Sequence, residues 1–317
     1  MTLSRTQTIR MLGSSVLALL LITAGNGCKN QAPEDYSAFV PHGAVADEVS
    51  VGGFTMRTYH SHSDDAPGAW DDIGSFEILR EGRRVYGQHG VGFYIAGRPR
   101  SFDEEAMRTP VPGTDITGNG RPNVVVYEWT GGAHSCFVAY VFELGDRCKM
   151  LASINGVDSI PAFTDLNGDS VLEVRLRDCT FRYWPESFGS SPLPEVILRW
   201  TGRRYEPDAK LMETPEPSEA ELKNMAEKIR SDAAWDRDPS GGYSRYYIPQ
   251  ELFQTALDLM YGGHEELGRR FIEMAWSPKY PLDKKLLSES DALLSESPYW
   301  NAIRKQRHAE GLRLETR

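Results

Sequence analysis

The chain has 317 residues, of which 40% are hydrophobic and 10% aromatic, and its formal net charge is −10. This composition is typical of a globular protein with a substantial core and argues against an intrinsically disordered chain. The acidic charge disfavours nucleic acid as a partner, and no basic stripe interleaved with aromatic residues occurs. We therefore expect one large folded domain or two smaller ones.

The first 28 residues have the order of parts found in an export signal. Arg5 and Arg10 precede an apolar run at residues 11–24, and residues 25–27 lead to Cys28. A helix of this run would be about 21 Å long, short of the roughly 30 Å of a hydrocarbon core, so a retained transmembrane helix is the weaker interpretation.

This segment resembles a bacterial lipoprotein signal, in which a cysteine after a small residue is lipidated. The resemblance implies a membrane partner, reached through a lipid anchor on Cys28. It also implies a cell-envelope location, on the outer membrane facing the periplasm or the exterior. Simple secretion after removal of residues 1–28 is the alternative.

Composition divides the rest of the chain into three parts. Residues 29–44 are polar and predict a short tether. Residues 45–212 alternate turn residues with short runs rich in β-branched and aromatic side chains, which predicts an antiparallel β-rich domain. Residues 213–317 show helical patterns. The expected fold class is therefore α+β and multidomain, with a β-rich domain followed by an α-helical domain.

The individual elements follow from local patterns. Strands are expected at residues 75–80, 83–88, 91–95, 123–129, 137–144, 149–154, 172–177 and 196–200. Helices are expected at residues 218–233, 249–261, 264–276, 283–295 and 298–310. Ser218 with Glu221 three residues on predicts a capping box at the first helix. The second and third helices resemble a tetratricopeptide hairpin, but one unit does not make a solenoid, so packing on the β-rich domain is the favoured interpretation.

Two similar segments carry the most chemical information. Residues 113–126 and 163–174 each place oxygen-bearing side chains at alternate positions and end in an apolar strand. Counted from Asp115 and Asp165, each has a glycine at the fourth position. Calcium takes six to eight oxygen ligands, which alternate residues of a tight loop can supply. An EF-hand is excluded, because Val126 and Leu176 stand where it needs a bidentate glutamate.

These segments resemble the calcium loops of FG-GAP/VCBS repeats, which form blades of integrin-like β-propellers. The resemblance implies structural Ca²⁺ and a blade-like domain, although an open sheet or a sandwich stays possible. The implied metal ligands of the first loop are Asp115, Thr117, Asn119, Asn123 and the Arg121 carbonyl. Those of the second loop are Asp165, Asn167, Asp169, Glu173 and the Val171 carbonyl.

The second loop has more carboxylates, and calcium affinity depends on ligand charge, so it is the stronger candidate. Asp, Asn and Gly are also ordinary turn residues, so a metal-free turn is the alternative interpretation of both loops.

Other candidate sites carry a weaker signal. Cys136, Cys148 and Cys179 would remain after lipidation of Cys28, either with one disulfide or as buried thiols. His134 stands beside a Gly-Gly turn and a serine, but neighbouring residues on a strand point to opposite faces.

We therefore expect no catalytic residues and favour an envelope-tethered, noncatalytic binding or scaffolding lipoprotein with a protein or glycan partner. The alternative is an envelope hydrolase with a site near His134. A buried carboxylate near His134 would favour the enzyme, and an exposed aromatic patch around Trp129, Tyr183 and Trp184 would favour binding.

Overall fold

The computed structural model describes Tyr36 and residues 38–60, 74–98, 105–131, 136–236 and 247–315. All of these belong to one compact unit, Ala32–Arg317. Cys28 and half of the expected tether, as well as His134, lie outside the described residues.

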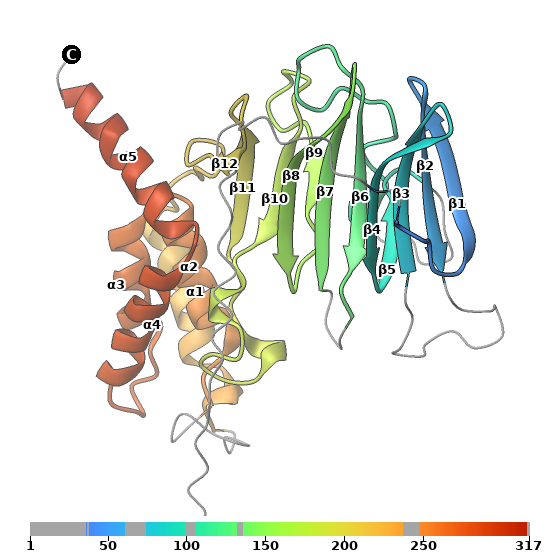
Figure 1. Ribbon diagram of the computed structural model, residues 1–317. Helices are drawn as coiled ribbons and strands as arrows, with labels where there is room; N and C mark the ends of the chain where they lie inside the picture. Colours follow the sequence, from blue (N-terminus) through green and yellow to red (C-terminus); the bar gives the residue numbers. More distant parts are fainter. Residues whose placement is uncertain are drawn as a thin grey trace, which may run out of the picture. The chain divides into compact units, whose positions relative to one another are not determined.

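The strands of the described residues form three four-stranded antiparallel sheets, named A, B and C here. Sheet A contains β1 (Ala44–Val51), β2 (Phe54–His60), β3 (Gly74–Arg80) and β4 (Arg83–Gly90). Sheet B contains β5 (Gly92–Ile95), β6 (Asn123–Trp129), β7 (Phe137–Leu144) and β8 (Cys148–Val157). Sheet C contains β9 (Ala162–Thr164), β10 (Glu173–Arg177), β11 (Glu195–Trp200) and β12 (Tyr205–Pro207). Each strand pairs with its neighbour in sequence, so every sheet is a meander, and the sheets follow one another across Figure 1.

Sheet B is covered by apolar contacts on both faces. Val124 and Val126 of β6 belong to one core cluster with Phe76 of sheet A. Val125 and Tyr127, which point to the opposite face of the same strand, belong to a second cluster with residues of sheet C and the helices. A strand buried on both faces reads as a continuous apolar run, which explains the sequence Asn123–Trp129.

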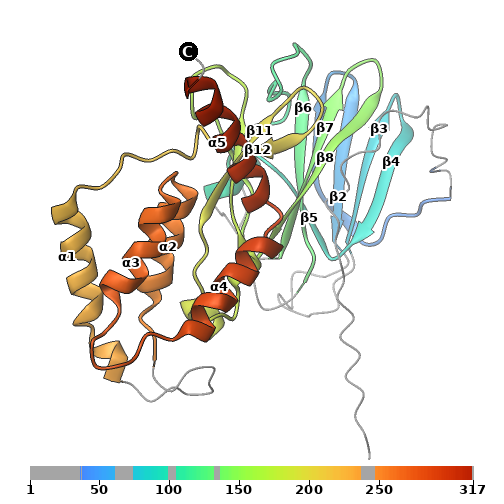
Figure 2. The ribbon, with the colours of Figure 1, turned by 90° about the vertical axis from the view of Figure 1, so that its left-hand side faces the viewer.

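The helical part follows sheet C in sequence and packs on it. Its helices are α1 (Glu219–Arg230), α2 (Gln250–Tyr261), α3 (Glu265–Ala275), α4 (Lys284–Glu296) and α5 (Trp300–Glu315). Figure 2 shows α1, α3 and α2 side by side, in agreement with the close contacts of α3 with both neighbours. The α+β fold with a β-rich part is thus confirmed, and the domain boundary between residues 212 and 213 stays a prediction.

Local signals account for several element ends. Ser218 and Glu221 form the expected capping box at the start of α1. Glu81 and Gly82 both have positive φ angles (50° and 75°), as a two-residue hairpin turn requires. Helix α1 ends at Arg230 rather than at residue 233, because the chain turns there into a short 3-10 helix, Ala233–Asp236, that buries Trp235.

Part of the range expected as a tether lies on sheet A. Arg84 of β4 donates hydrogen bonds to the carbonyls of Tyr36 (3.3 Å) and Phe39 (2.9 Å). The Phe39 ring stacks on His89 with a centroid distance of 4.4 Å. Any side chain at Gly87 would meet that ring, so a glycine is needed there for the close approach.

Candidate metal-binding loops

Loop 1, residues 113–123, precedes β6 and is organised around the carboxylate of Asp115. Its Oδ1 accepts hydrogen bonds from the backbone N–H groups of Thr117 (3.1 Å) and Gly118 (2.8 Å). Its Oδ2 accepts one from Gly120 N–H (2.6 Å). The carboxylate therefore satisfies the inward-pointing donors of its own loop, as an Asx-type turn does.

Loop 2, residues 163–173, precedes β10 and repeats this arrangement around Asp165. Oδ1 of Asp165 accepts from Gly168 N–H (2.7 Å), and Oδ2 accepts from Ser170 N–H (3.0 Å). The φ angles of Gly168 (77°) and Ser170 (67°) are positive, as are those of the equivalent Gly118 (71°) and Gly120 (79°). The expected fourth-position glycine thus meets a conformational need that only Gly fills without strain.

The last ligand positions also match. Oδ1 of Asn123 accepts from Ile116 N–H (2.9 Å), and Oε2 of Glu173 accepts from Leu166 N–H (3.0 Å). In both loops, the side chain of the first strand residue therefore binds the backbone N–H of the residue that follows the central aspartate. The two segments have the same local fold as well as similar sequences.

The two loops lie directly against each other. Leu172 N–H of loop 2 donates to the Ile116 carbonyl of loop 1 at 3.0 Å. A Cβ atom on Gly118 would come within 2.7 Å of Cγ2 of Val171. One loop therefore forms part of the other loop's packing surface.

Loop 1 directs its remaining polar side chains toward β7. Glu143 accepts hydrogen bonds from Nδ2 of Asn119 (2.5 Å) and from Nη1 of Arg121 (2.8 Å). Burial acts to raise the pKa of Glu143, but these hydrogen bonds outweigh it and leave the pKa lowered. The Asn119 side chain thus donates to the Glu143 carboxylate. Arg121 was expected to offer only its carbonyl, but its side chain forms an ion pair with the same carboxylate.

Loop 2 contains a second arginine-carboxylate group. Nη2 of Arg199, from β11, lies 2.7 Å from Oδ2 of Asp169. The same guanidinium lies 3.9 Å from Oε1 of Glu173 and 3.9 Å from Oδ2 of Asp208. The pKa of Asp169 is lowered, first by the hydrogen bond from Val171 N–H and further by Asn167 and Arg199.

The structure brings the predicted ligands of each loop into one turn without gathering three of their carboxylates. Among the described residues, no group of three His, Cys, Asp or Glu side chains is placed to hold a metal ion. Glu173, which is 0% exposed, and Asp169 instead share the Nδ2 donor of Asn167. Thr117 stays within its turn, with its hydroxyl 3.4 Å from Asp115. Calcium at either loop stays a prediction.

Cys148 and Cys179 are free thiols. Burial raises the pKa of Cys148 to about 12 and that of Cys179 to about 11, so both are protonated at neutral pH.

The three aromatic side chains considered as one exposed patch do not share a surface. Tyr183 is 53% exposed, whereas Trp184 is 8% exposed and packs on Phe253 with a centroid distance of 4.4 Å. Trp129 packs against the core cluster of sheets B and C. These side chains therefore do not provide the exposed patch that would have favoured binding, because Trp184 is packed on α2.

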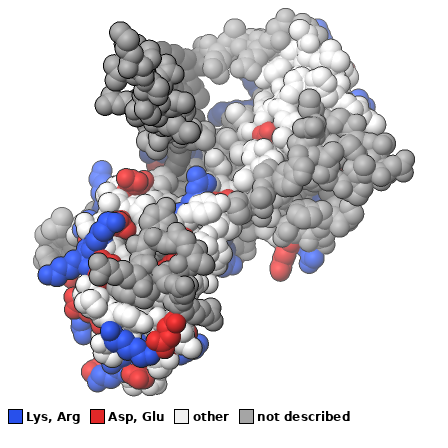
Figure 3. Space-filling view, turned by 90° about the horizontal axis from the view of Figure 1, so that it is seen from below, with Lys and Arg blue, Asp and Glu red and all other residues white. Residues whose placement is uncertain are grey.

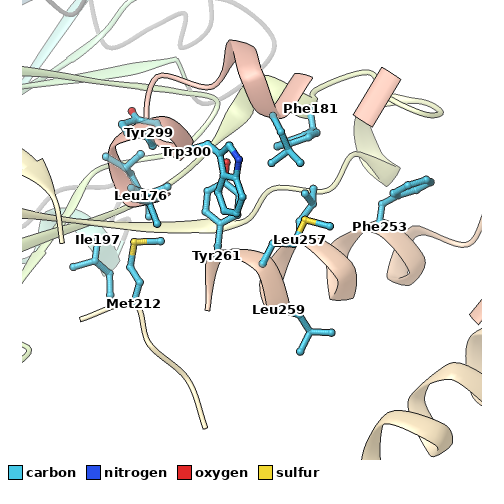
Figure 4. Packing of buried hydrophobic residues seen from close by; sticks show 14 of the residues in the cluster. Leu176, Phe181, Ile197, Met212, Phe253, Leu257, Leu259, Tyr261, Tyr299 and Trp300 are labelled. Carbon is cyan, nitrogen blue, oxygen red and sulfur yellow. The ribbon is translucent and has the colours of Figure 1, made fainter. Parts of the chain in front are cut away.

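A buried polar cluster that sequence patterns did not predict joins sheet C to the helices. Asp178, 1% exposed at the end of β10, accepts hydrogen bonds from Tyr261 Oη (2.6 Å) and Ser297 Oγ (2.5 Å). Ser297 in turn accepts from Trp300 N–H at the start of α5. Figure 4 shows Tyr261 beside Trp300, and their rings stack at 5.0 Å. The Ser-Pro-Tyr-Trp sequence at residues 297–300, where α5 begins, was the one sequence feature that could have indicated this cluster.

Charged side chains on the helical part carry both signs. Seen from below, Lys and Arg alternate with Asp and Glu over the part that contains the helices, on the left (Figure 3). The ion pairs of the helical part include Arg269 with Asp291 and Lys279 with Asp236. Such exposed pairs stabilise the fold little, but they keep the surface solvated.

Comparison with known proteins adds no relative. No protein-family model, no curated protein and no solved structure matches the chain. Within the described residues, no helix has both the length and the apolar character needed to cross a membrane.

Proposed function

We propose that this protein is a noncatalytic binding or scaffolding module of the bacterial cell envelope, whose sheets are stiffened by calcium in loop 2 and, more weakly, in loop 1. The observation that supports the proposal is the paired geometry of the two loops. Each is closed by the same hydrogen bonds, each precedes the second strand of its sheet, and the loops pack on each other.

The chemistry of the loops is compatible with a hard cation. Each carboxylate oxygen of Asp165 accepts one backbone hydrogen bond and has lone pairs left, and calcium prefers such oxygens. Loop 2 offers the carboxylates of Asp165, Asp169 and Glu173, whereas loop 1 offers that of Asp115. A small rotation of exposed side chains such as that of Asp169 would direct the remaining lone pairs of the loop toward one calcium ion. Calcium there would fix the turns that place sheets B and C.

The test is calcium titration of the processed protein by calorimetry, together with thermal melts in calcium and in chelator. We expect binding, and a stabilisation of about 2.7 kcal/mol when calcium exceeds its Kd by about 100-fold. The variant with Asp165→Asn and Asp169→Asn, which keeps acceptor oxygens but removes two charges, should lose both effects.

The matched control replaces two exposed glutamates of α1, Glu219→Gln and Glu227→Gln, and removes the same charge far from the loops. It should bind calcium as the parent does. Absence of binding by the parent protein at millimolar calcium would show that the loops are turns only.

The envelope location rests on Cys28 and has its own test. A lipid anchor should place the protein in the membrane fraction, and Cys28→Ser should move it to the soluble fraction. If the parent protein is found in the soluble fraction after export, the proposed lipid anchor is wrong, and simple secretion is the remaining alternative. A membrane-anchored module of this kind would present its sheets to a protein or glycan partner.

A further inference from the structure

Arg199 occupies a position where a positive charge is required. Glu173 is 0% exposed, and a buried carboxylate is costly unless cations or donors compensate it. Its donors are Leu166 N–H and Asn167 Nδ2, and Arg199 is the cation found within 4 Å of it among the described residues.

The carboxylates around this guanidinium come from two segments that are distant in the chain. Asp169 and Glu173 belong to loop 2, whereas Asp208 follows β12. Their oxygens lie 2.7, 3.9 and 3.9 Å from nitrogens of Arg199. The protein has therefore assembled a negative pocket around a cation that it supplies itself.

A second feature of the same place is an unsatisfied oxygen. The Tyr205 hydroxyl is buried and has no hydrogen-bond partner among the described residues. Burial raises the pKa of Tyr205, and the nearby charge of Glu173 raises it further. A calcium ion keeps water in part of its shell, and such a water is a suitable partner for this hydroxyl.

We propose that Arg199 is the resident cation of loop 2 and that calcium enters the loop only by displacing it. This inference rests on the proposed function of the loop. A guanidinium and a divalent ion would both need the outer oxygens of Asp169 and Glu173, and two cations within about 4 Å repel each other strongly. Because the Arg199 side chain is 44% exposed, it can swing into solvent at little cost.

Arg199 thus sets the calcium threshold of the protein. At low calcium the arginine offsets part of the negative charge of the three carboxylates, and the loop stays folded. At high calcium the ion replaces the arginine and forms a shell that the monovalent guanidinium cannot. The loop would then serve as a sensor of high calcium concentrations and not as a permanently loaded structural site.

The test compares Arg199→Gln with Arg175→Gln in the processed protein, using calcium alone as the probe. Arg175 is a matched control, because it lies on the adjacent strand β10, is similarly exposed and pairs with Glu195 outside the loop. Arg199→Gln should bind calcium roughly tenfold more tightly than the parent, because the competing charge is gone. In chelator it should melt at a lower temperature than Arg175→Gln, and calcium should remove this difference in melting temperature.

The outcomes separate this inference from the proposed function. If the parent and Arg199→Gln bind calcium equally, the loop is a calcium site and the competition is overturned. If only Arg199→Gln binds, the competition is supported and the parent loop is not a calcium site. If neither binds at millimolar calcium, both proposals are overturned. Tighter binding by Arg175→Gln as well would reduce the effect to net charge and overturn the role of Arg199.

Discussion

Single residues decide how closely the two loops approach each other. Gly118 has a positive φ angle and touches Val171, while Gly120 has nearly the same φ angle and open space around its Cα hydrogens. Substitutions at these two glycines can therefore distinguish the effect of the backbone conformation from the effect of the contact between the loops.

We predict that Gly118→Ala destabilises the protein more than Gly120→Ala. Both substitutions force alanine into the left-handed region, which costs about 1–2 kcal/mol. Only the methyl group at position 118 also meets Val171, at 2.7 Å, so the loops must move apart. Urea unfolding measures both variants. Equal losses would mean that the contact between the loops contributes nothing.

The sequence predicted the interior of each loop but not its surroundings. Asp165 and Gly168 are close in the chain, so their spacing alone indicates a turn. Arg199 lies 30 residues from Asp169, and its approach depends on the pairing of β10 with β11. Such a contact leaves no local pattern, so a search for oxygen ligands did not find the competing cation.

Polar side chains as well as apolar ones join sheets A and B. Oε2 of Glu128 in β6 accepts hydrogen bonds from Tyr140 Oη (2.6 Å) and from Nε2 of Gln88 in β4 (3.0 Å). Gly90 leaves room for this carboxylate, because any Cβ there would overlap its oxygen. Burial raises the pKa of Glu128, and the hydrogen bond from Tyr140 opposes the shift only in part.

We predict that ionisation of Glu128 weakens this contact between the sheets. A raised folded-state pKa means that the folded protein binds the proton more tightly than the unfolded chain. The resulting stability is present below the unfolded value of 4.5 and is lost as the pH rises through the raised pKa. Glu128→Gln should therefore gain stability over the parent as the pH rises from 4 to 7. The exposed Glu81→Gln should show no such trend, and a flat difference for Glu128→Gln would contradict the prediction.

At the scale of elements, long patterns were informative and short ones were not. The strand expected at residues 137–144 coincides with β7, and the capping box marks the start of α1. Strands β9 and β12, of three residues each, were missed because three residues cannot establish an alternating period. Strands β1 and β2 were not predicted although the domain was expected to begin near them, since β1 is largely exposed and reads as a polar segment.

For the whole molecule, the Asp178 cluster joins the β-rich part to the helices. The Asp178 carboxylate directly follows β10, Tyr261 ends α2 and Ser297 directly follows α4, and all three are buried. The apolar cluster around them is shared by sheets B and C and the helices, so the two parts have a common core. Sequence composition marked the change from strands to helices but contained no sign of this shared core.

We predict that Tyr261→Phe costs about 1.5–3 kcal/mol, because it removes a donor to a buried charge. The control is Tyr205→Phe in chelator, which removes a buried hydroxyl without a partner in the described structure and should be nearly neutral. In a double-mutant cycle with Asp178→Asn, the two losses should not add. Additive losses would show that the hydrogen bond does not couple the two parts.

The meander order of the sheets has a consequence for how the chain folds. All strand pairings described here join neighbours in sequence, so no sheet has to wait for a strand from a later sheet. Each sheet can assemble as soon as its own four strands are available. The middle sheet, however, exposes an apolar face until the third sheet arrives, and such a face favours aggregation. Chains interrupted before β10 should therefore be the species most in need of a chaperone.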